Sequence, residues 1–415
     1  MKNHPLVKTF FTLKGNPRAC VYTEPLWSVP YNLFMPFASV YMAALLLTDS
    51  QIGIVASVSM FFRAIFALLS GAITDKLGRK KATVIFDTLS WSVPCLLWAF
   101  SQNFIWFIVA AAFNGMMQIP DTSWTCLLVE DAEKRSMVRI YSLVHVLGQI
   151  AIVFAPIAAL LVNQFSVVPV MRVLYLFAVL SMTSKFVLLY RHCDETKVGM
   201  IRKKETANMS IFKILSGYGQ VLGRVLRSPG MVLALILSAI FVSTTMIMNN
   251  FFGLYVTGDL LIPEHFLAYF PILRSLIIIV FLFIIQPKIS RFGFKRPMLA
   301  GVLIYIASHA VLLVAPTNNL VVPFVYVFLE ACAFSLVMPR RDSIVALLID
   351  PDERARISSI ITVLTLCCSI PFGYLAGWLS DMDRRLPFVL DAALFALAIA
   401  AVCLGGKLMA RKEES

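Results

Sequence analysis

Twelve apolar runs, each long enough to cross a lipid bilayer, occupy most of this 415-residue sequence. A membrane-crossing helix needs about 20 predominantly apolar residues. Because lipid offers the backbone no hydrogen-bond partner, each run is expected to be a helix. The sequence therefore predicts an all-α integral membrane protein with 12 transmembrane helices. The runs are 24–47, 51–74, 82–101, 104–129, 140–163, 167–190, 229–257, 265–287, 297–315, 319–349, 357–380 and 386–406.

The distribution of positive charge predicts the orientation. With twelve spans, both termini lie on one side of the membrane, and the connections on that side hold 28 of the 36 lysines and arginines. The opposite loops hold only Arg172, Arg384 and Arg385. Lys and Arg accumulate in cytoplasmic loops, so both termini are expected in the cytoplasm of a multi-pass protein of the cytoplasmic membrane. The net charge of +13 is thus read as a topology signal, and no nucleic-acid partner is expected.

The chain repeats itself after roughly half its length. LLVEDAEKR (127–135) parallels LLIDPDER (347–354), and DKLGRKK (75–81) parallels SRFGFKR (290–296). Two six-span halves of the same orientation form the parallel repeat of a secondary transporter. The expected domains are an N-terminal six-helix bundle (1–191), a cytoplasmic linker with a basic amphipathic helix (192–228) and a C-terminal six-helix bundle (229–415).

A short motif joins the second and third predicted spans. GAITDKLGRKK (71–81) resembles the G-x-x-x-D-[RK]-x-G-[RK]-[RK] signature of the major facilitator superfamily (MFS). The resemblance implies the fold of two pseudo-symmetric bundles, transport by alternating access, and a conformational latch in this loop that favours the outward-open state. The predicted latch and gate residues are Gly71, Asp75, Gly78, Arg79, Lys80, Arg340 and Asp342.

Two details of the latch follow from the residue chemistry. Asp75 ends its span on the cytoplasmic side, where a carboxylate can cap the N-terminus of the eleventh span. Arg79 and Lys80 can pair with the acidic groups of EDAEKR (130–135) or bind lipid phosphate.

Polar residues inside the spans mark the transport path. Spans 1, 4, 7 and 10 line the path in the family that the motif resembles. Asn32 lies between Pro30 and Pro36, which predicts a broken first helix. Helix glue, meaning hydrogen bonds between neighbouring helices, is the alternative role for the amides. The predicted substrate or ion pathway residues are Asn32, Arg63, Asn114, Gln118, Asp121, Trp124, Asn249, Asn250, Arg274, Glu330 and Arg341.

Arg63 and Arg274 lie midway along the second and eighth spans. An arginine in hydrocarbon costs roughly 2.5–3.5 kcal/mol or more, so both should face the interior. Each either binds a carboxylate or phosphate of the substrate, or forms a structural ion pair with Asp121, Glu330 or Asp342. Asp121 and Glu330 are the candidate proton carriers, and Glu330 is preferred because it is deeper. Lys185 is expected to extend to the inner surface.

The stretch LVMPRRDSIV (336–345) places three ionisable groups in the cytoplasmic third of the tenth span. Its partner in the repeat is QIPDTSW (118–124) of the fourth span. Arg341 is expected either to meet Asp121 and close the inner exit or to bind substrate. Arg340 and Asp342 are expected to pair with neighbouring helices.

The predicted function is secondary active transport of a small organic solute, namely proton-coupled efflux, of the antiporter type, of a metabolite or drug. The alternative is uptake or exchange of an organic anion bound by Arg63 and Arg274, and a remote alternative is a non-transporting membrane sensor. No GxSxG or HExxH motif, metal-ligand cluster or GxxxxGK[ST] loop occurs, so no enzyme, metal or cofactor is expected, and a proton or ion gradient supplies the energy. The partners are the lipid bilayer and the solute, and the chain is expected to act as a monomer.

Overall fold

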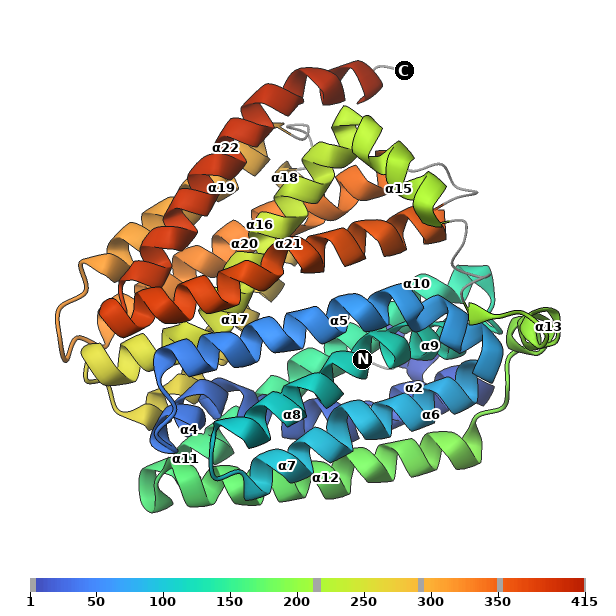
Figure 1. Ribbon diagram of the computed structural model, residues 1–415, viewed down its shortest axis with the longest axis horizontal. Helices are drawn as coiled ribbons and strands as arrows, with labels where there is room; N and C mark the ends of the chain where they lie inside the picture. Colours follow the sequence, from blue (N-terminus) through green and yellow to red (C-terminus); the bar gives the residue numbers. More distant parts are fainter. Residues whose placement is uncertain (1–4, 212–217, 290–294, 349–353, 414–415) are drawn as a thin grey trace. The chain divides into compact units, whose positions relative to one another are not determined.

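The computed structural model describes residues 5–211, 218–289, 295–348 and 354–413, and every regular element in these ranges is a helix. The chain forms two compact units. Unit 1 comprises Met1–Met35 and Phe61–Gly217, and unit 2 comprises Pro36–Met60 and Tyr218–Ser415. Helix α5 (Asp49–Leu77), labelled in Figure 1, contributes its first part to unit 2 and the rest to unit 1.

Unit 1 is a bundle in which α12 packs against α3 and α7, and α6 packs against α9. Its elements besides α5 are α1 (Pro5–Thr12), α2 (Gly15–Thr23), α3 (Pro25–Phe34), α6 (Arg79–Asp87), η2 (Thr88–Ser92), α7 (Val93–Phe100), α8 (Phe104–Asn114), η3 (Gly115–Met117), α9 (Gln118–Val129), α10 (Lys134–Ile152), α11 (Ala155–Phe165), α12 (Val167–His192) and α13 (Lys197–Thr206).

Unit 2 is a second bundle in which α19 packs against α20 and α22, and α16 packs against α21 and α22. Its elements are η1 (Met35–Phe37, which begins at the last residue of the first part of unit 1), α4 (Ala38–Ala44), α15 (Tyr218–Arg227), α16 (Pro229–Leu254), η4 (Tyr255–Asp259), η5 (Glu264–Ala268), α17 (Tyr269–Val280), η6 (Phe281–Ile285), α18 (Gln286–Ile289), α19 (Lys295–Leu313), α20 (Val321–Leu348), α21 (Arg354–Met382) and α22 (Leu386–Glu413).

Ten helices of the described residues are long and apolar enough to cross a membrane. They coincide with ten of the twelve predicted spans, and most of their ends agree to within a few residues. They run Asp49–Leu77, Arg79–Phe100, Phe104–Val129, Arg139–Phe165, Val167–His192, Pro229–Asp259, Lys295–Leu313, Val321–Arg341, Ile357–Met382 and Leu386–Cys403.

The other two predicted spans, 24–47 and 265–287, consist of shorter consecutive helices. In the first, the predicted break lies at Pro36, inside the 3-10 helix η1, whereas Pro30 is accommodated within α3. Proline has no N–H for the helix ladder, so a tighter turn forms there at little cost. In the second, α17 leads through the π-helix η6 into α18.

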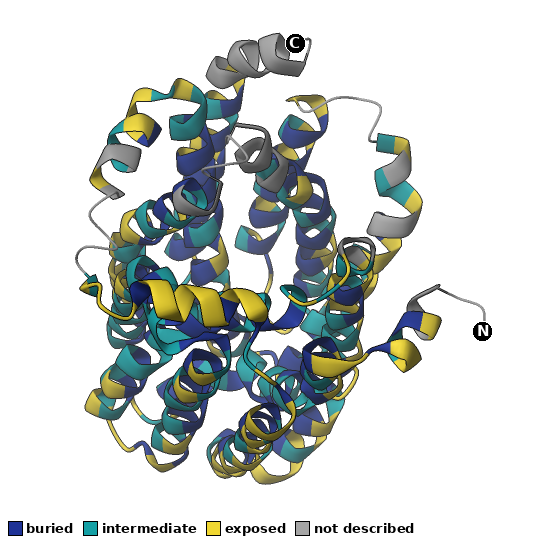
Figure 2. Ribbon diagram, turned by 90° about the vertical axis from the view of Figure 1, so that its right-hand side faces the viewer, coloured by how far each residue is buried: buried dark blue, intermediate teal, exposed yellow. Residues whose placement is uncertain are grey.

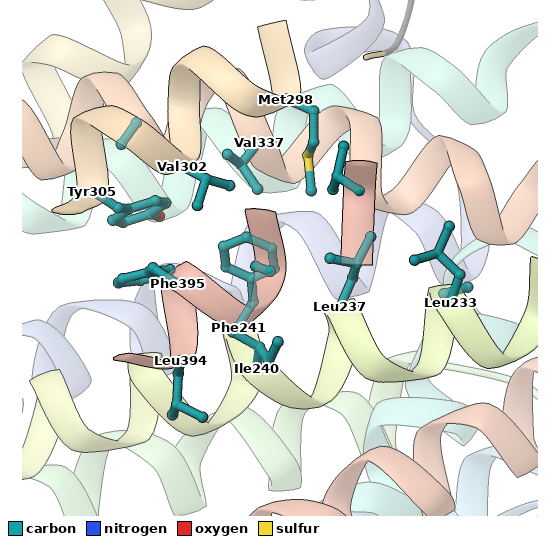
Figure 3. Packing of buried hydrophobic residues seen from close by; sticks show 14 residues of the cluster. Leu233, Leu237, Ile240, Phe241, Met298, Val302, Tyr305, Val337, Leu394 and Phe395 are labelled. Atoms are coloured by element: carbon teal, nitrogen blue, oxygen red, sulfur yellow. The ribbon is translucent and has the colours of Figure 1, made fainter. Parts of the chain in front are cut away.

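Unit 2 has a well-packed apolar core between α16, α19, α20 and α22. Figure 3 shows its side chains, with the rings of Tyr305 and Phe395 lying against each other. These rings are stacked with centroids 4.4 Å apart. Figure 2 shows buried and exposed residues alternating around the long helices, as expected when one stripe of each helix contacts its neighbours.

The segment 36–60, which the sequence assigns to the first bundle, packs within unit 2. Glycines permit this packing. A Cβ atom on Gly53 would lie 2.4 Å from the carbonyl oxygen of Gly373, and one on Gly377 would lie 2.7 Å from that of Asp49. Residues without side chains let two helix backbones approach closely. Helices α5 and α21 are therefore in direct backbone contact here.

Candidate transport site

In unit 1, Arg63 lies beside the fourth predicted span. With its amide oriented so that the oxygen faces the guanidinium, Gln118 accepts hydrogen bonds from Arg63 Nη2 and Nε at 3.2 and 3.3 Å. Arg63 also interacts electrostatically with Asp121 and Tyr31. Asp121 is exposed although it lies within a membrane-spanning helix. This carboxylate therefore lies within electrostatic reach of an arginine inside a membrane-spanning helix.

A glycine brings these groups together. A Cβ atom on Gly115 would lie 2.5 Å from Cβ of Phe62 and 3.0 Å from the amide nitrogen of Arg63. Gly115 begins the 3-10 helix η3, which separates α8 from α9. The close approach of α5 at Gly115 places Arg63 against Gln118, the first residue of α9.

A second polar group in unit 1 corrects the expectation for Lys185. Its ammonium group does not extend to the surface but donates to Glu24 Oε2 at 2.7 Å, and both side chains are buried. The rings of Trp27 and Trp124 lie 5.7 and 5.3 Å from the lysine Nζ. An ammonium in this position needs an ion partner because leaving it unpaired inside a protein is costly. Trp124, a predicted pathway residue, thus packs against a buried lysine.

In unit 2, Arg274 and Glu330 form a bidentate pair. Arg274 donates from Nε to Glu330 Oε2 at 2.7 Å and from Nη2 to Oε1 at 3.1 Å. The side chain of Glu330 is 4% exposed, whereas that of Arg274 is 28% exposed. The guanidinium also lies over the ring of Phe334, 4.3 Å from its centroid. Of the two alternatives for Arg274, the structure contains the ion pair, and one part of the guanidinium stays accessible.

The predicted amide residues make hydrogen bonds to helix backbones. Asn114 donates to the carbonyl oxygen of Ser90 and so joins α8 to η2, as expected of helix glue. Asn32 and Asn250 donate to carbonyl oxygens one turn earlier in their own helices. Asn249 is exposed.

The motif loop is held by acidic residues. Arg79 donates to Asp75 Oδ1 at 2.8 Å and to both carboxylate oxygens of Glu130, which belongs to the EDAEKR segment. Glu195 accepts from the backbone N–H groups of Arg79 and Lys80, at 2.8 and 3.3 Å.

The glycine of this loop fits its conformation. Gly78 has a φ of +87°, which disfavours any residue with a side chain, and a Cβ atom there would collide with the carboxylate of Glu195. Gly71 lies half-buried within α5. The loop is thus fixed to the segment that follows α12, and its function as a latch stays a prediction.

The stretch 336–345 lies in α20. Arg340 is buried and donates to the carbonyl oxygen of Leu336 in its own helix at 2.7 Å. Arg341 is partly buried and acts electrostatically on Tyr305. The side chain of Asp342 lies outside the described residues, and the meeting of Arg341 with Asp121 stays a prediction.

An ion-pair network in unit 2 was not predicted from the sequence. Arg384 donates to Asp49 from Nε at 2.8 Å and from Nη2 at 3.2 Å, and Asp49 also accepts from Ser380 at 2.6 Å. Nη1 of Arg384 lies 3.7 Å from Oδ1 of Asp259. The hydrogen bond to Asp49 raises the pKa of Arg384. Beside this network lies a groove of about 450 Å³ lined by α4, η4, the 260–264 loop and Arg384.

One sequence signal pointed toward this network. Gly373 and Gly377 form a G-x-x-x-G pair within an apolar span, which is the usual mark of close helix contact. The charges themselves carry no such signal, because Asp49 and Arg384 both lie at the ends of spans, where charged residues are ordinary.

The sequence signature of the MFS_1 like family matches residues 31–403. The chain belongs to this family. The family and the similar solved structures are transporters, not enzymes, so this chain is a multi-pass membrane transporter of the major facilitator type. No curated protein sequence matches the chain.

Solved structures of the same fold share little sequence with the chain. A variant of the nucleoside transporter NupG has a TM-score of 0.74 at 18% identity, over 94% of this chain and 99% of that one. The peptide transporter POT in complex with sulfate has a TM-score of 0.71 at 13% identity, over 97% and 96%. A bacterial homologue of the iron transporter ferroportin, in its inward-facing state, has a TM-score of 0.69 at 12% identity, over 94% and 98%.

Proposed function

We propose that this chain is a proton-coupled secondary transporter that exports a small organic solute across the cytoplasmic membrane by alternating access. In this proposal the chain crosses the membrane twelve times, with 24–47 and 265–287 as the broken spans, both termini are cytoplasmic, and the monomer is functional. The observation that carries the proposal is the bidentate pair between Arg274 and Glu330 inside unit 2.

Unit 1 supports the proposal with a similar arrangement. Arg63 on its second span lies electrostatically close to Asp121 on its fourth, as Arg274 on the eighth span lies against Glu330 on the tenth. Arg274 is thus already compensated by a carboxylate and is poorly suited to hold a permanently bound anion, and Arg63 has a carboxylate within electrostatic reach. An arginine–carboxylate pair changes its strength when the carboxylate gains a proton or the arginine meets a solute group. Such a pair can respond both to solute binding and to a proton taken up elsewhere in the same bundle.

The similar structures support the proposed class of solute, and features of the sequence support the proposed direction of transport. The similar structures include transporters of nucleosides and peptides and one solved with 5-aminolevulinic acid, all small polar organic solutes. The short loops, the abundance of aromatic residues and methionine, and the APIAA segment (155–159) of the fifth span favour export.

The test is a solute screen with the purified chain in proteoliposomes, under imposed pH and sodium gradients. We expect at least one metabolite or drug-like solute to accumulate against its gradient when the pH gradient is imposed. We expect the sodium gradient to have no such effect. Accumulation driven by sodium alone, or solute binding without flux as in a sensor, would contradict the proposal.

A second candidate is exchange of an organic anion. It is favoured by the accessible part of the Arg274 guanidinium, because Glu330 beside it is nearly fully buried. The matched variants Arg63→Gln and Arg274→Gln separate the two candidates. Loss of anion exchange in both variants supports the second candidate, and unchanged transport of every accepted anion excludes it.

A further inference from the structure

His309 and Asp391 lie together inside unit 2, away from the arginine–carboxylate pair. His309 Nε2 and Asp391 Oδ2 are 3.5 Å apart, and the two residues are 2% and 0% exposed. Within the part of the chain that the structure describes, neither oxygen of Asp391, nor His309 Nε2, nor the hydroxyl of Tyr326 has a hydrogen-bond partner. Buried polar atoms are normally satisfied, so this group calls for a ligand.

The protonation state of the imidazole follows from its other nitrogen. His309 Nδ1 lies 2.8 Å from the carbonyl oxygen of Tyr305, and a carbonyl oxygen only accepts hydrogen bonds. Nδ1 therefore carries the hydrogen, and in the neutral ring Nε2 is a bare acceptor. Two acceptors, Nε2 and a carboxylate oxygen, then face each other, and a proton between them turns this contact into a hydrogen bond.

We propose that His309 and Asp391 form a proton-binding site in which a single proton is shared between His309 Nε2 and Asp391 Oδ2, and that the coupling proton of this transporter binds there. The second clause rests on the proposed function. The proton comes from water and adds to the lone pair of Nε2. The pair changes from a neutral imidazole with a carboxylate to an imidazolium with a carboxylate, so its net charge rises from −1 to zero. Burial favours the uncharged pair.

Glu330 is less suited to this task. It accepts two hydrogen bonds from Arg274, and its protonation would break a buried ion pair. Among the described residues, no lysine or arginine forms an ion pair with Asp391, and its histidine neighbour is itself able to take up a proton. The structure thus favours Asp391 over the carboxylate that the sequence suggested.

The His309 ring is surrounded by aromatic side chains, among them Tyr326 and Phe395. One turn away, at Tyr305 and Phe395, begins the core shown in Figure 3. Tyr326 meets the His309 ring edge to face, with centroids 5.4 Å apart, and precedes Glu330 by one helical turn of α20. Tyr326 thus lies between His309 and the helix turn that carries Glu330, the partner of Arg274.

Among the described residues, two titratable groups besides His309 interact electrostatically with Asp391, namely Tyr305 and Tyr326. Helix α16 carries none along its whole length. Both His309 and Asp391 lie within about 8 Å, along the helix axes, of the nearest ends of α19 and α22, where water can reach. Glu330, Arg274 and Arg341 interact in turn with one or both of these tyrosines. The other titratable groups on neighbouring elements are Tyr255 on η4 and the exposed Cys367, Cys368, Tyr374 and Asp381 on α21.

The test needs no identified solute. The full-length chain is purified in detergent micelles with nitrogen-15-labelled histidine, and the imidazole signals are followed by NMR as the pH is changed. The variant His309→Gln assigns the His309 signal. We expect this signal to change from imidazole to imidazolium in the wild type. In Asp391→Asn we expect proton binding at His309 to weaken by about tenfold or more, because the carboxylate that stabilises the cation is gone.

Two controls make the result specific. Asp383→Asn changes an exposed aspartate three residues before α22 and should leave the His309 titration unchanged. Glu330→Gln should shift it far less than Asp391→Asn does. Circular dichroism and size-exclusion chromatography verify that each variant is folded. A His309 signal that stays neutral throughout, or that titrates alike in wild type and Asp391→Asn, overturns the proton site.

The same variants separate this inference from the proposed function. If a pH gradient drives transport and Asp391→Asn leaves that coupling intact while Glu330→Gln abolishes it, the coupling proton binds at Glu330 and only the inference fails. If His309 titrates as expected but no pH gradient drives transport, the proposed function fails and the proton site remains. A change of the His309 signal with sodium at constant pH would replace the proton by a metal cation and overturn the inference.

Discussion

The contact between Asp49 and Arg384 offers a sharp test of how the segment 36–60 is held in unit 2. The perturbation is Asp49→Asn. The asparagine keeps the size of the side chain and one oxygen acceptor but removes the negative charge. In the wild type this carboxylate accepts two hydrogen bonds from Arg384 and one from Ser380.

The magnitude follows from these bonds. A hydrogen bond to a charged group contributes about 1.5–3 kcal/mol. The side chain of Arg384 is 29% exposed and Asp49 is 6% exposed, so solvent screens part of the interaction. We expect Asp49→Asn to weaken the attachment of the segment by about 1–2 kcal/mol, which is a factor of roughly 5–30 in the local opening equilibrium.

Hydrogen–deuterium exchange with mass spectrometry measures this equilibrium directly. We expect faster exchange in peptides covering 45–60 and 370–386 of the variant, with unchanged exchange in α12, which lies in unit 1. The matched control is Asp383→Asn, next to Arg384, where the carboxylate accepts a hydrogen bond from the backbone N–H of Arg385. Equal exchange in wild type and Asp49→Asn, or an equal effect of the control, would refute the reasoning.

Three further variants test other contacts. Gly377→Leu places a Cβ atom 2.7 Å from a backbone oxygen of α5, and we expect a loss of about 1–3 kcal/mol in thermal unfolding experiments. Asp75→Asn removes an anionic partner of Arg79, and distances between spin labels on the cytoplasmic ends of the two bundles should shift toward inward-open values. Glu24→Gln leaves Lys185 buried without its anion, and we expect it to lower the unfolding free energy by about 3 kcal/mol.

Two of these variants have a counterpart that should do less. Gly219→Leu introduces the same side chain where a Cβ meets nothing within 4 Å. Glu205→Gln breaks the exposed pair with Arg202, which is expected to contribute at most about 1 kcal/mol. An unchanged label distribution in Asp75→Asn would contradict the latch.

The sequence predicted the helices well because hydrophobic length is a local property. Ten predicted spans coincide with helical stretches long and apolar enough to cross a membrane, and the proline-dependent break in the first predicted span lies at Pro36. The contact of the motif loop could also be predicted from the sequence. The partner of Arg79 is Glu130, which belongs to the acidic segment EDAEKR predicted from the sequence. What the pattern could not provide was the set of contacts between segment 36–60 and α21, because they join residues more than 300 positions apart.

Pairings between distant spans explain most of what the sequence missed. From the sequence, Lys185 is expected to reach the membrane surface. In the structure it pairs with Glu24, which is 161 positions away in the chain. His309 and Asp391 each occur singly in an apolar run, and nothing in either run points to the other. Only packing of α19 against α22 brings the two residues together.

The pairings that did emerge share one physical cause. Ionisable groups inside a bilayer are retained only where a partner compensates them or where their charge changes during function. Lys185 and Arg274 each have a carboxylate at 2.7 Å and belong to the first class. Asp391 has no hydrogen-bond donor among the described residues and faces a histidine nitrogen that is an acceptor in the neutral ring. A group of that kind fits the second class, and the inferred proton site therefore lies at Asp391 rather than at the well-paired Glu330.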